Sequence, residues 1–373
     1  MKNVGICRMV FPCVSETFIV EQASHLRRYH PTFVVARLLR EVPFDNVKLT
    51  AASLWGWQER LFWLTRQAGG RARHEALRRL PLLHAHFGRD GVYALALAEA
   101  IDIPLVVTYH GFDATASPLA LWCSRGLMNY QFLLHEAALQ RRAAAIIAVS
   151  DFIRERLLAK GCPPEKIIRH YIGIDTAKFT PAERPADERY ILCVGRHAKR
   201  KGIDVLIEAF ARIAARHPEV ALVQIGAGAL TGELQALARR LGVAGRVRFL
   251  GAQPHARVIE WMRGAEIFSL PSRTSRSGDS EALGIVFNEA SACAVPVVST
   301  RHGGIPEAIL DGETGLLAPE GDAVALAEKL DILLADRGLG RRLGLRGREF
   351  VCEQFDIDTQ TAKLEAVYDR FAA

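Results

Sequence analysis

Short apolar runs alternate along the chain with longer segments in which apolar residues recur every three or four positions. The runs have the length of buried strands, and the periodic segments are typical of amphipathic helices. Four clear strand-like runs are Leu105–Thr108, Ala145–Val149, Val220–Ile225 and Pro296–Ser299. Strands that alternate with helices predict parallel, doubly wound sheets, so the pattern indicates the α/β class.

A length of 373 residues suits two such domains rather than a single core. A polar, proline-containing segment, Thr180–Asp187, interrupts the alternation near the middle of the chain. We therefore expect an N-terminal Rossmann-like domain over residues 1–180 and a C-terminal one from residue 181 to residue 355.

A basic loop follows the first strand-like run of the second half. Tyr190–Val194 leads into Gly195, and the loop ends at Gly202 before a helix for which Asp204 is the expected N-cap. The apolar positions of that helix share one face: Val205, Leu206, Ala209, Phe210 and Ile213. Loops at the carboxyl edge of a parallel sheet bind ligands in such folds. Arg196 and Lys201 could neutralise a diphosphate there, whereas we interpret Lys199 and Arg200 as solvated.

Two glutamates flank an apolar run that predicts a buried helix. Glu281 is expected in the loop before it and Glu289 about two turns inside it. The helix start would offer backbone amides to phosphate oxygens, and we assign this role to Leu283, Gly284 and Ile285. Because carboxylates accept hydrogen bonds from hydroxyls, the combination predicts a sugar-nucleotide site. For the two glutamates alone, ordinary surface charge is the alternative.

In order and spacing, these motifs resemble those of the retaining glycosyltransferases of family 4. The resemblance continues through Ala290–Thr300, Gly303–Glu307 and Asp311–Leu317. Family members usually have Gly where Ala294 stands, a change that backbone geometry should absorb. The resemblance implies the glycosyltransferase B fold, with an acceptor-binding N-terminal domain facing a donor-binding C-terminal domain across a cleft. Residues 356–373 are then expected as a helix that packs back on the N-terminal domain.

The resemblance also implies a reaction. The donor is a UDP- or GDP-hexose, and the configuration at its anomeric carbon is retained. Arg196 and Lys201 would stabilise the departing diphosphate, so we expect neither a metal nor another cofactor. Glu289 would accept hydrogen bonds from the ribose hydroxyls and Glu281 from the sugar hydroxyls. We do not assume a double displacement on carboxylates; instead the leaving phosphate oxygen would deprotonate the acceptor hydroxyl on the same face.

Histidines occur where strands of the first half end. His84 and His86 alternate on one strand, so a metal pair is conceivable, but no third ligand lies nearby in sequence. We expect both to line the sheet edge, with His86 a candidate acceptor contact. His110 follows the run Leu105–Thr108, and a lone histidine there is usually structural. The resemblance places a histidine against the donor sugar at this point, so His110 is our catalytic candidate, together with Glu281, Arg196 and Lys201.

A second group of candidates concerns the acceptor. Ser15, Glu16 and Thr17 stand where family members commonly have a glycine-rich loop, and this variant resembles exopolysaccharide and colanic-acid-type assembly members. We assign all three to the acceptor site, with helix capping as the alternative for Ser15. Ser150 precedes a helix beside the expected cleft. We treat it mainly as a fold element that could also face the acceptor.

Charge is uneven along the chain. Residues 1–180 hold 23 Lys and Arg against 15 Asp and Glu, and the remainder holds 25 against 26. No nucleic-acid motif accompanies this excess. Trp55, Trp57 and Trp63 instead precede a string of arginines: Arg66, Arg71, Arg73, Arg78 and Arg79. This composition predicts peripheral contact with an anionic membrane, with packing of the aromatic residues in the core as the alternative.

The remaining features narrow the function. None of the seven cysteines forms a CxxC pair, which indicates reduced thiols in the cytoplasm. No GxGxxG follows the first strand, which argues against a nicotinamide-dependent oxidoreductase. We predict a hexosyltransferase at the inner face of the cytoplasmic membrane that acts on a polyprenyl-diphosphate-linked oligosaccharide in bacterial cell-surface polysaccharide synthesis. A nucleotide-sugar epimerase, a transferase with a soluble acceptor and a non-catalytic binding module are the alternatives.

Overall fold

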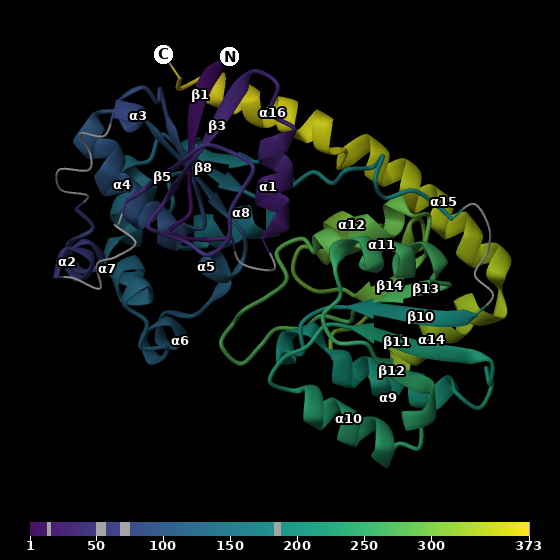
Figure 1. Ribbon diagram of the computed structural model, residues 1–373. Helices are drawn as coiled ribbons and strands as arrows, with labels where there is room; N and C mark the ends of the chain where they lie inside the picture. Colours follow the sequence, from purple (N-terminus) through teal and green to yellow (C-terminus); the bar gives the residue numbers. More distant parts are fainter. Residues whose placement is uncertain (13–15, 50–56, 68–74, 183–187, 373) are drawn as a thin grey trace. The chain divides into compact units, whose positions relative to one another are not determined.

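The computed structural model describes residues 1–12, 16–49, 57–67, 75–182 and 188–372. The chain forms two compact units (Figure 1). The N-terminal unit contains Met1–Gly173 and Ile357–Ala373, and the C-terminal unit contains Ile174–Asp356. The boundaries expected from the sequence lie after residues 180 and 355, whereas these units divide after residues 173 and 356. Both units are α/β with parallel sheets, so the predicted fold class is confirmed.

The described part of the N-terminal unit has a sheet of seven parallel strands. In spatial order they are β5 (Asn46–Lys48), β3 (Tyr29–Val35), β1 (Lys2–Cys7), β6 (Leu83–His86), β7 (Leu105–Tyr109), β8 (Ala145–Ala148) and β9 (Ile167–Arg169). The chain adds strands to one side of β1 and then returns to add the others beyond it. Such a switch point, here between β1 and β6, is where doubly wound sheets bind ligands.

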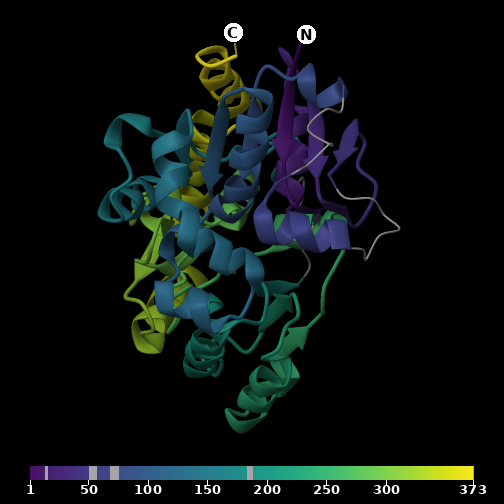
Figure 2. The same cartoon turned by 90° about the vertical axis from the view of Figure 1, so that its left-hand side faces the viewer.

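Helices connect these strands and cover the sheet. They are α1 (Thr17–Ser24), α2 (Trp57–Thr65), α3 (Glu75–Arg78), α4 (Gly88–Ile101), α5 (Phe112–Thr115), α6 (Pro118–Cys123), α7 (Leu127–Arg142) and α8 (Asp151–Ala159), while β2 (Val10–Phe11) pairs with β4 (Arg37–Leu38) beside the sheet. Helices α4 and α7 pack side by side (Figures 1 and 2). Gly91 lets α4 approach the sheet closely, because a Cβ there would lie 2.9 Å from Val107.

The C-terminal unit repeats the scheme, and its described residues form six parallel strands. Their order is β12 (Val247–Phe249), β11 (Val220–Ile225), β10 (Arg189–Val194), β13 (Ile267–Ser269), β14 (Val297–Thr300) and β15 (Gly315–Ala318). Its helices are α9 (Ile203–Ile213), α10 (Thr231–Arg240), α11 (His255–Gly264), α12 (Ile285–Ala292), α13 (Ile305–Ala308), α14 (Ala323–Ala335) and α15 (Arg337–Gln354). The switch point lies between β10 and β13.

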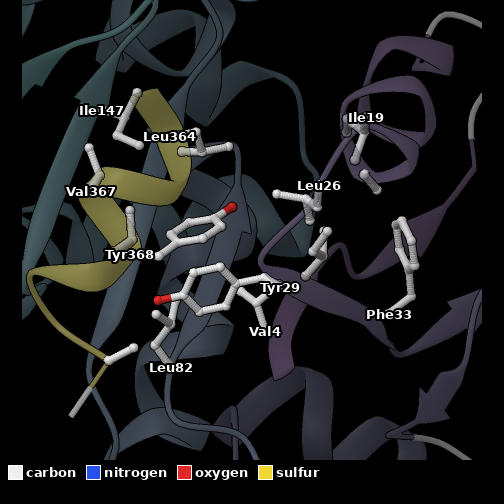
Figure 3. Packing of buried hydrophobic residues seen from close by; sticks show 14 of the residues in the cluster. Val4, Ile19, Leu26, Tyr29, Phe33, Leu82, Ile147, Leu364, Val367 and Tyr368 are labelled. Carbon is white, nitrogen blue, oxygen red and sulfur yellow. The ribbon is translucent and has the colours of Figure 1, made fainter. Parts of the chain in front are cut away.

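The last helix, α16 (Ile357–Asp369), completes the core of the N-terminal unit (Figure 3). Its Leu364, Val367 and Tyr368 are buried against the first strands, and the Tyr368 ring meets Tyr29 edge to face at 5.2 Å. The buried carboxylate of Glu365 accepts hydrogen bonds from the amides of Arg27 and Arg28, at 2.8 and 2.6 Å. The two chain ends consequently meet, and Lys2 donates to the carbonyl of Ala372 (Figures 1 and 2).

The structure tests three local predictions from the sequence, which concern the apolar face of α9, its N-cap and the backbone at Ala294. The predicted apolar face of α9 is confirmed, since all five of its residues are buried. Asp204 is not the N-cap, because the left-handed Gly202 leads directly into Ile203 and places Asp204 in the first turn. Ala294 adopts φ 56°, the left-handed conformation that glycine adopts most easily. The backbone thus accommodates alanine at this site at the expense of some strain.

Candidate active site

The basic loop and the first glutamate meet in the C-terminal unit. Lys201 ends a short turn after β10, and its ammonium lies 2.5 Å from Oε2 of Glu281. Ser272 donates to the same oxygen at 3.2 Å. Both charged side chains are largely buried, with 13% of Lys201 and 12% of Glu281 exposed. The structure therefore brings together two residues that the sequence separates by 80 positions.

Arg200 also belongs to this cluster. Its Nε lies 3.1 Å from Oδ2 of Asp279, and its Nη1 lies 3.5 Å from Oε2 of Glu281. The interpretation of Arg200 as a solvated residue is therefore wrong, because the turn at residues 199–201 directs its side chain inward. Lys199 is exposed as expected and pairs with Glu233. Arg196 is exposed, and its charge acts on Lys201 and Asp279.

The cluster keeps Glu281 ionised. Burial alone opposes the negative charge, but Lys201, Arg200 and the hydroxyl of Ser272 together lower the pKa of Glu281 to about 2. At neutral pH this carboxylate can only accept hydrogen bonds. The Lys201 ammonium has three donors and uses one for Glu281, so the others can serve a phosphate oxygen.

Glu289 lies on α12, which begins at Ile285 after the left-handed Gly284. It is therefore about one turn inside the helix, not two, because the loop containing Glu281 is longer than expected. Oε1 of Glu289 lies 3.8 Å from Nε2 of His255. A Cβ at Gly284 would lie 2.4 Å from the ring of Phe287, so this entry to the helix requires glycine. The first amides of α12 have the orientation that suits an anion.

In the N-terminal unit, the candidate histidines lie where adjacent strands end. His86 ends β6 and His110 follows β7; their Nδ1 and Nε2 atoms are 3.0 Å apart. Phe87 and Phe18 pack against the His110 ring, and Nδ1 of His110 is buried with no hydrogen-bond partner among the described residues. Burial, together with nearby positive groups, lowers the pKa of His110 well below its ordinary value. His110 is thus a neutral imidazole with an unused nitrogen.

Neighbouring groups fix the surroundings of this histidine. Asp113 accepts from the amides of His110 and Gly111 at 3.1 and 3.0 Å, so it orders the loop. His84 is bound on both ring nitrogens, by Tyr368 at 2.6 Å and Thr108 at 2.7 Å. Among the residues that the structure describes, no group of three or more His, Cys, Asp or Glu is arranged to hold a metal ion.

The acceptor candidates are differently placed. Glu16 is buried and pairs with Arg8 at 2.5 Å, while Thr17 is the exposed first residue of α1. Ser15 lies outside the described residues. Ser150 is fully buried and caps α8 by accepting from the amide of Ile153 at 3.1 Å, in keeping with its interpretation as a fold element. The acceptor roles of Ser15, Glu16, Thr17, His86 and Ser150 remain predictions.

Sequence reasoning missed Arg8 and Asp90. Arg8 follows β1, and its Nη1 lies 2.7 Å from both carboxylate oxygens of Asp90, which also accepts from the amide of Met9. Together with Glu16 they form a buried charge cluster at the end of β1, beside the ring of Phe87. The only signal in the sequence is a charged residue directly after a buried strand.

The segment proposed to contact a membrane is described in part. Trp55, Arg71 and Arg73 lie outside the described residues. Trp63 is half-buried, with its ring 5.2 Å from that of Tyr93. Leu61 and Leu64 on the same helix are exposed. Within the described ranges, no helix combines the length and the apolar character needed to cross a bilayer.

Two family models match the chain in tandem. Residues 15–178 match the model "Glycosyltransferase Family 4", and residues 175–350 match "Glycosyl transferases group 1". Together the two matches contain the candidate residues of both units. The chain belongs to this family of glycosyltransferases, as the resemblance in its motifs predicts.

Two relatives illustrate the similarity in sequence. A putative colanic acid biosynthesis glycosyltransferase WcaL of Salmonella typhimurium is 28% identical over 97% of this chain and 99% of its own length. A GDP-mannose-dependent phosphatidylinositol monomannoside mannosyltransferase of Mycolicibacterium smegmatis is 36% identical over 60% of this chain and 61% of its own. The chain is accordingly a glycosyltransferase similar to enzymes of exopolysaccharide biosynthesis.

A solved structure shows the same fold. HepE of Anabaena, crystallised with UDP and glucose, superposes with a TM-score of 0.79 over 99% of each chain at 19% identity. The glycosyltransferase B fold expected from the motifs is therefore confirmed.

Proposed function

We propose that the protein transfers a hexose from a UDP- or GDP-sugar to a polyprenyl-diphosphate-linked oligosaccharide, with retention of configuration. The observation that carries the donor assignment is the buried Lys201–Glu281 pair beside Arg200 at the β10 switch point. In this proposal Lys201 binds phosphate and Glu281, whose low pKa keeps it ionised at neutral pH, accepts hydrogen bonds from hydroxyls. The names of the similar proteins, which include a GDP-mannose-dependent enzyme and a UDP complex, support a sugar nucleotide.

In the proposed mechanism the protein stabilises charge on the leaving diphosphate. Lys201 and Arg196, with the first amides of α12, bind the phosphate oxygens as the glycosidic bond stretches. Since these groups already supply positive charge, the proposal requires no divalent metal. Glu289 binds the ribose and Glu281 the hexose hydroxyls.

The state of Glu281 supports a same-face transfer over a double displacement on this carboxylate. Glu281 is ionised at neutral pH, so it cannot serve as a general acid, and its ion pair with Lys201 weakens it as a nucleophile. We therefore propose that the leaving phosphate oxygen takes the proton of the acceptor hydroxyl on the same face. His110, neutral and with one unused nitrogen, is proposed to contact the donor sugar.

The acceptor is proposed from the relatives. WcaL and the amylovoran glycosyltransferase AmsK of Erwinia amylovora are named for exopolysaccharide synthesis. We propose that this protein acts in a similar synthesis at the inner face of the cytoplasmic membrane, in peripheral contact with anionic lipid through its basic N-terminal half.

The test is donor turnover measured with and without a polyprenyl-diphosphate-linked acceptor, in buffer containing EDTA. Transfer only with the lipid-linked acceptor supports the proposal, and NMR of the product's anomeric proton reads retention directly. Consumption of donor without any acceptor would identify an epimerase instead. Activity that EDTA abolishes and Mg²⁺ restores would contradict the metal-free mechanism, and transfer to a free sugar would point to a soluble acceptor.

A further inference from the structure

One turn after β14 holds the backbone of Glu281 on both sides. The amide of Glu281 donates to Nε2 of His302 at 3.2 Å, and the amide of Gly304 donates to the carbonyl of Glu281 at 3.0 Å. A Cβ at Gly303 would lie only 2.2 Å from that carbonyl oxygen, so the turn approaches as closely as glycine allows. The main chain of Glu281, the candidate for binding the sugar, is therefore held in place by residues 302–304.

The contacts of the two ring nitrogens of His302 define its tautomer. A backbone amide only donates, so Nε2 of His302 must be the accepting nitrogen. The proton of the neutral imidazole is then on Nδ1, which lies 2.9 Å from Oε2 of Glu320. The His302 side chain is only 3% exposed. Both contacts are satisfied by one tautomer, and the carboxylate of Glu320 selects it.

Glu320 in turn is fixed to the other end of the same loop. Its Oε1 accepts from the amide of Thr274 at 2.6 Å. Partial burial opposes its ionisation, but the contacts with Thr274 and His302 lower the pKa of Glu320 below its ordinary value. The loop between β13 and α12 is thus bound at Thr274 by Glu320 and at Glu281 by His302.

We propose that His302, oriented by Glu320, is a positioning residue that holds the backbone of Glu281 so that its carboxylate stays on Lys201 and faces the donor sugar. The inference rests on the proposed donor site and adds to it a group that need not touch the substrate. The side chain of Glu281 is set by contacts of 2.5 Å to Lys201 and 3.2 Å to Ser272. A loop released at His302 loses this alignment while Lys201 remains able to bind phosphate.

The experiment compares sugar nucleotides with nucleotides that lack the sugar. Calorimetry on the protein measures the affinity for UDP-glucose and for UDP, and likewise the affinity for GDP-mannose and for GDP. His302→Leu should weaken the sugar nucleotide that wild type binds by about tenfold, the cost of about one lost hydrogen bond. The affinity for the corresponding nucleoside diphosphate, UDP or GDP, should change by less than about threefold. His302→Gln should retain most of the affinity, because its amide can accept from Glu281 and donate to Glu320.

A matched control is the His217–Asp331 pair of the same unit, in which Nε2 of His217 lies 2.8 Å from Oδ1 of Asp331. Neither residue belongs to the loop between β13 and α12. His217→Leu should leave the ratio of the two affinities unchanged. Hydrogen exchange of the unliganded protein gives a second readout. The Glu281 amide should exchange faster in His302→Leu and at the wild-type rate in His217→Leu.

The two possible failures are distinguishable. If His302→Leu weakens both ligands equally, or leaves the Glu281 amide as protected as in wild type, the positioning role is refuted while the donor site stands. If wild type binds none of the four nucleotides, the proposed function fails, and this inference fails with it.

Discussion

Arg8 and Asp90 form a two-pronged ion pair inside the N-terminal unit, with one guanidinium nitrogen 2.7 Å from each carboxylate oxygen. The other arm of Arg8 holds Glu16, so a buried cation joins the end of β1 to the starts of α1 and α4. Arg8 and Glu16, which precede and follow residues 13–15 in the sequence, are thus joined by buried charge.

Removing Arg8 should therefore be costly. Arg8→Met leaves two buried carboxylates without their cation, and we expect a loss of about 3–5 kcal/mol in unfolding free energy. Denaturant unfolding followed by hydrogen exchange in the N-terminal unit measures it. Arg257→Met, which breaks the exposed pair with Glu260, is the control and should cost less than about 1 kcal/mol. Equal losses of unfolding free energy in both variants would show that the buried cluster stabilises the protein no more than an exposed ion pair does.

Replacement of the diphosphate cations should impair catalysis. Arg196→Ala and Lys201→Ala are each expected to lower kcat/KM by at least about 30-fold, or about 2 kcal/mol of transition-state stabilisation. Lys199→Ala, two positions from Lys201 but 61% exposed, is the matched control and should behave like wild type. Activity within threefold of wild type in both test variants contradicts the assignment.

The two glutamates should be separable by ligand. Glu289→Gln should weaken binding of the free nucleoside diphosphate and of the sugar nucleotide alike, because both contain the ribose. Glu281→Gln should weaken the sugar nucleotide much more, by about tenfold for one charge-assisted hydrogen bond. Calorimetry that finds the same losses for both ligands in both variants would overturn these roles.

Buried histidines should make the N-terminal unit sensitive to acid. Burial lowers the pKa of His84 to about 3 and that of His170 to about 4, from 6.5 in the unfolded chain. The unfolded state then binds more protons, so stability present above pH 6.5 is lost as pH falls toward 4. The slope is about 1.4 kcal/mol per pH unit for each histidine.

His84→Gln should reduce the pH dependence of the unfolding free energy, measured at pH 7 and at pH 4.5, by the contribution of one histidine. Val106→Ala on the neighbouring strand removes a buried methyl pair without removing a titrating group. It should lower stability by the same amount at both pH values. An unchanged slope in His84→Gln would mean that this imidazole titrates alike in the folded and unfolded protein.

Membrane contact should depend on charge. Wild type should float with anionic liposomes at low salt and dissociate at high salt, with each basic residue near the surface contributing about 1 kcal/mol. Replacing Arg71, Arg73, Arg78 and Arg79 by Gln should abolish flotation and leave donor binding intact. The control replaces four exposed arginines of the C-terminal unit, namely Arg239, Arg240, Arg341 and Arg342. If both variants float alike, the proposed membrane face is wrong.

The sequence predicts those parts of the fold that depend on local pattern. The face of α9 and the positions of Lys201 and Glu281 follow from periodicity and from motifs at strand ends. Arg200, Asp90 and His302 could not be predicted in the same way. Their partners are separated from them in the sequence. In addition, the conformation of a single turn decides whether a charged side chain points into the protein or into solvent. Ala294 shows the converse case, since its unusual backbone could be expected from the glycine that usually stands there.

Helix α16 gives this protein an unusual order of assembly. The residues that cover Val4 and Tyr29 follow the whole C-terminal unit in the sequence and are synthesised after it, whereas the C-terminal unit is one uninterrupted stretch of chain. Synthesis from the N-terminus normally lets the first domain fold first. Here the first-made half must wait, with part of its apolar surface open, until Leu364, Val367 and Tyr368 have been synthesised after the C-terminal unit. A chain that ended at Asp356 would therefore contain the whole C-terminal unit but lack the helix that covers Val4 and Tyr29.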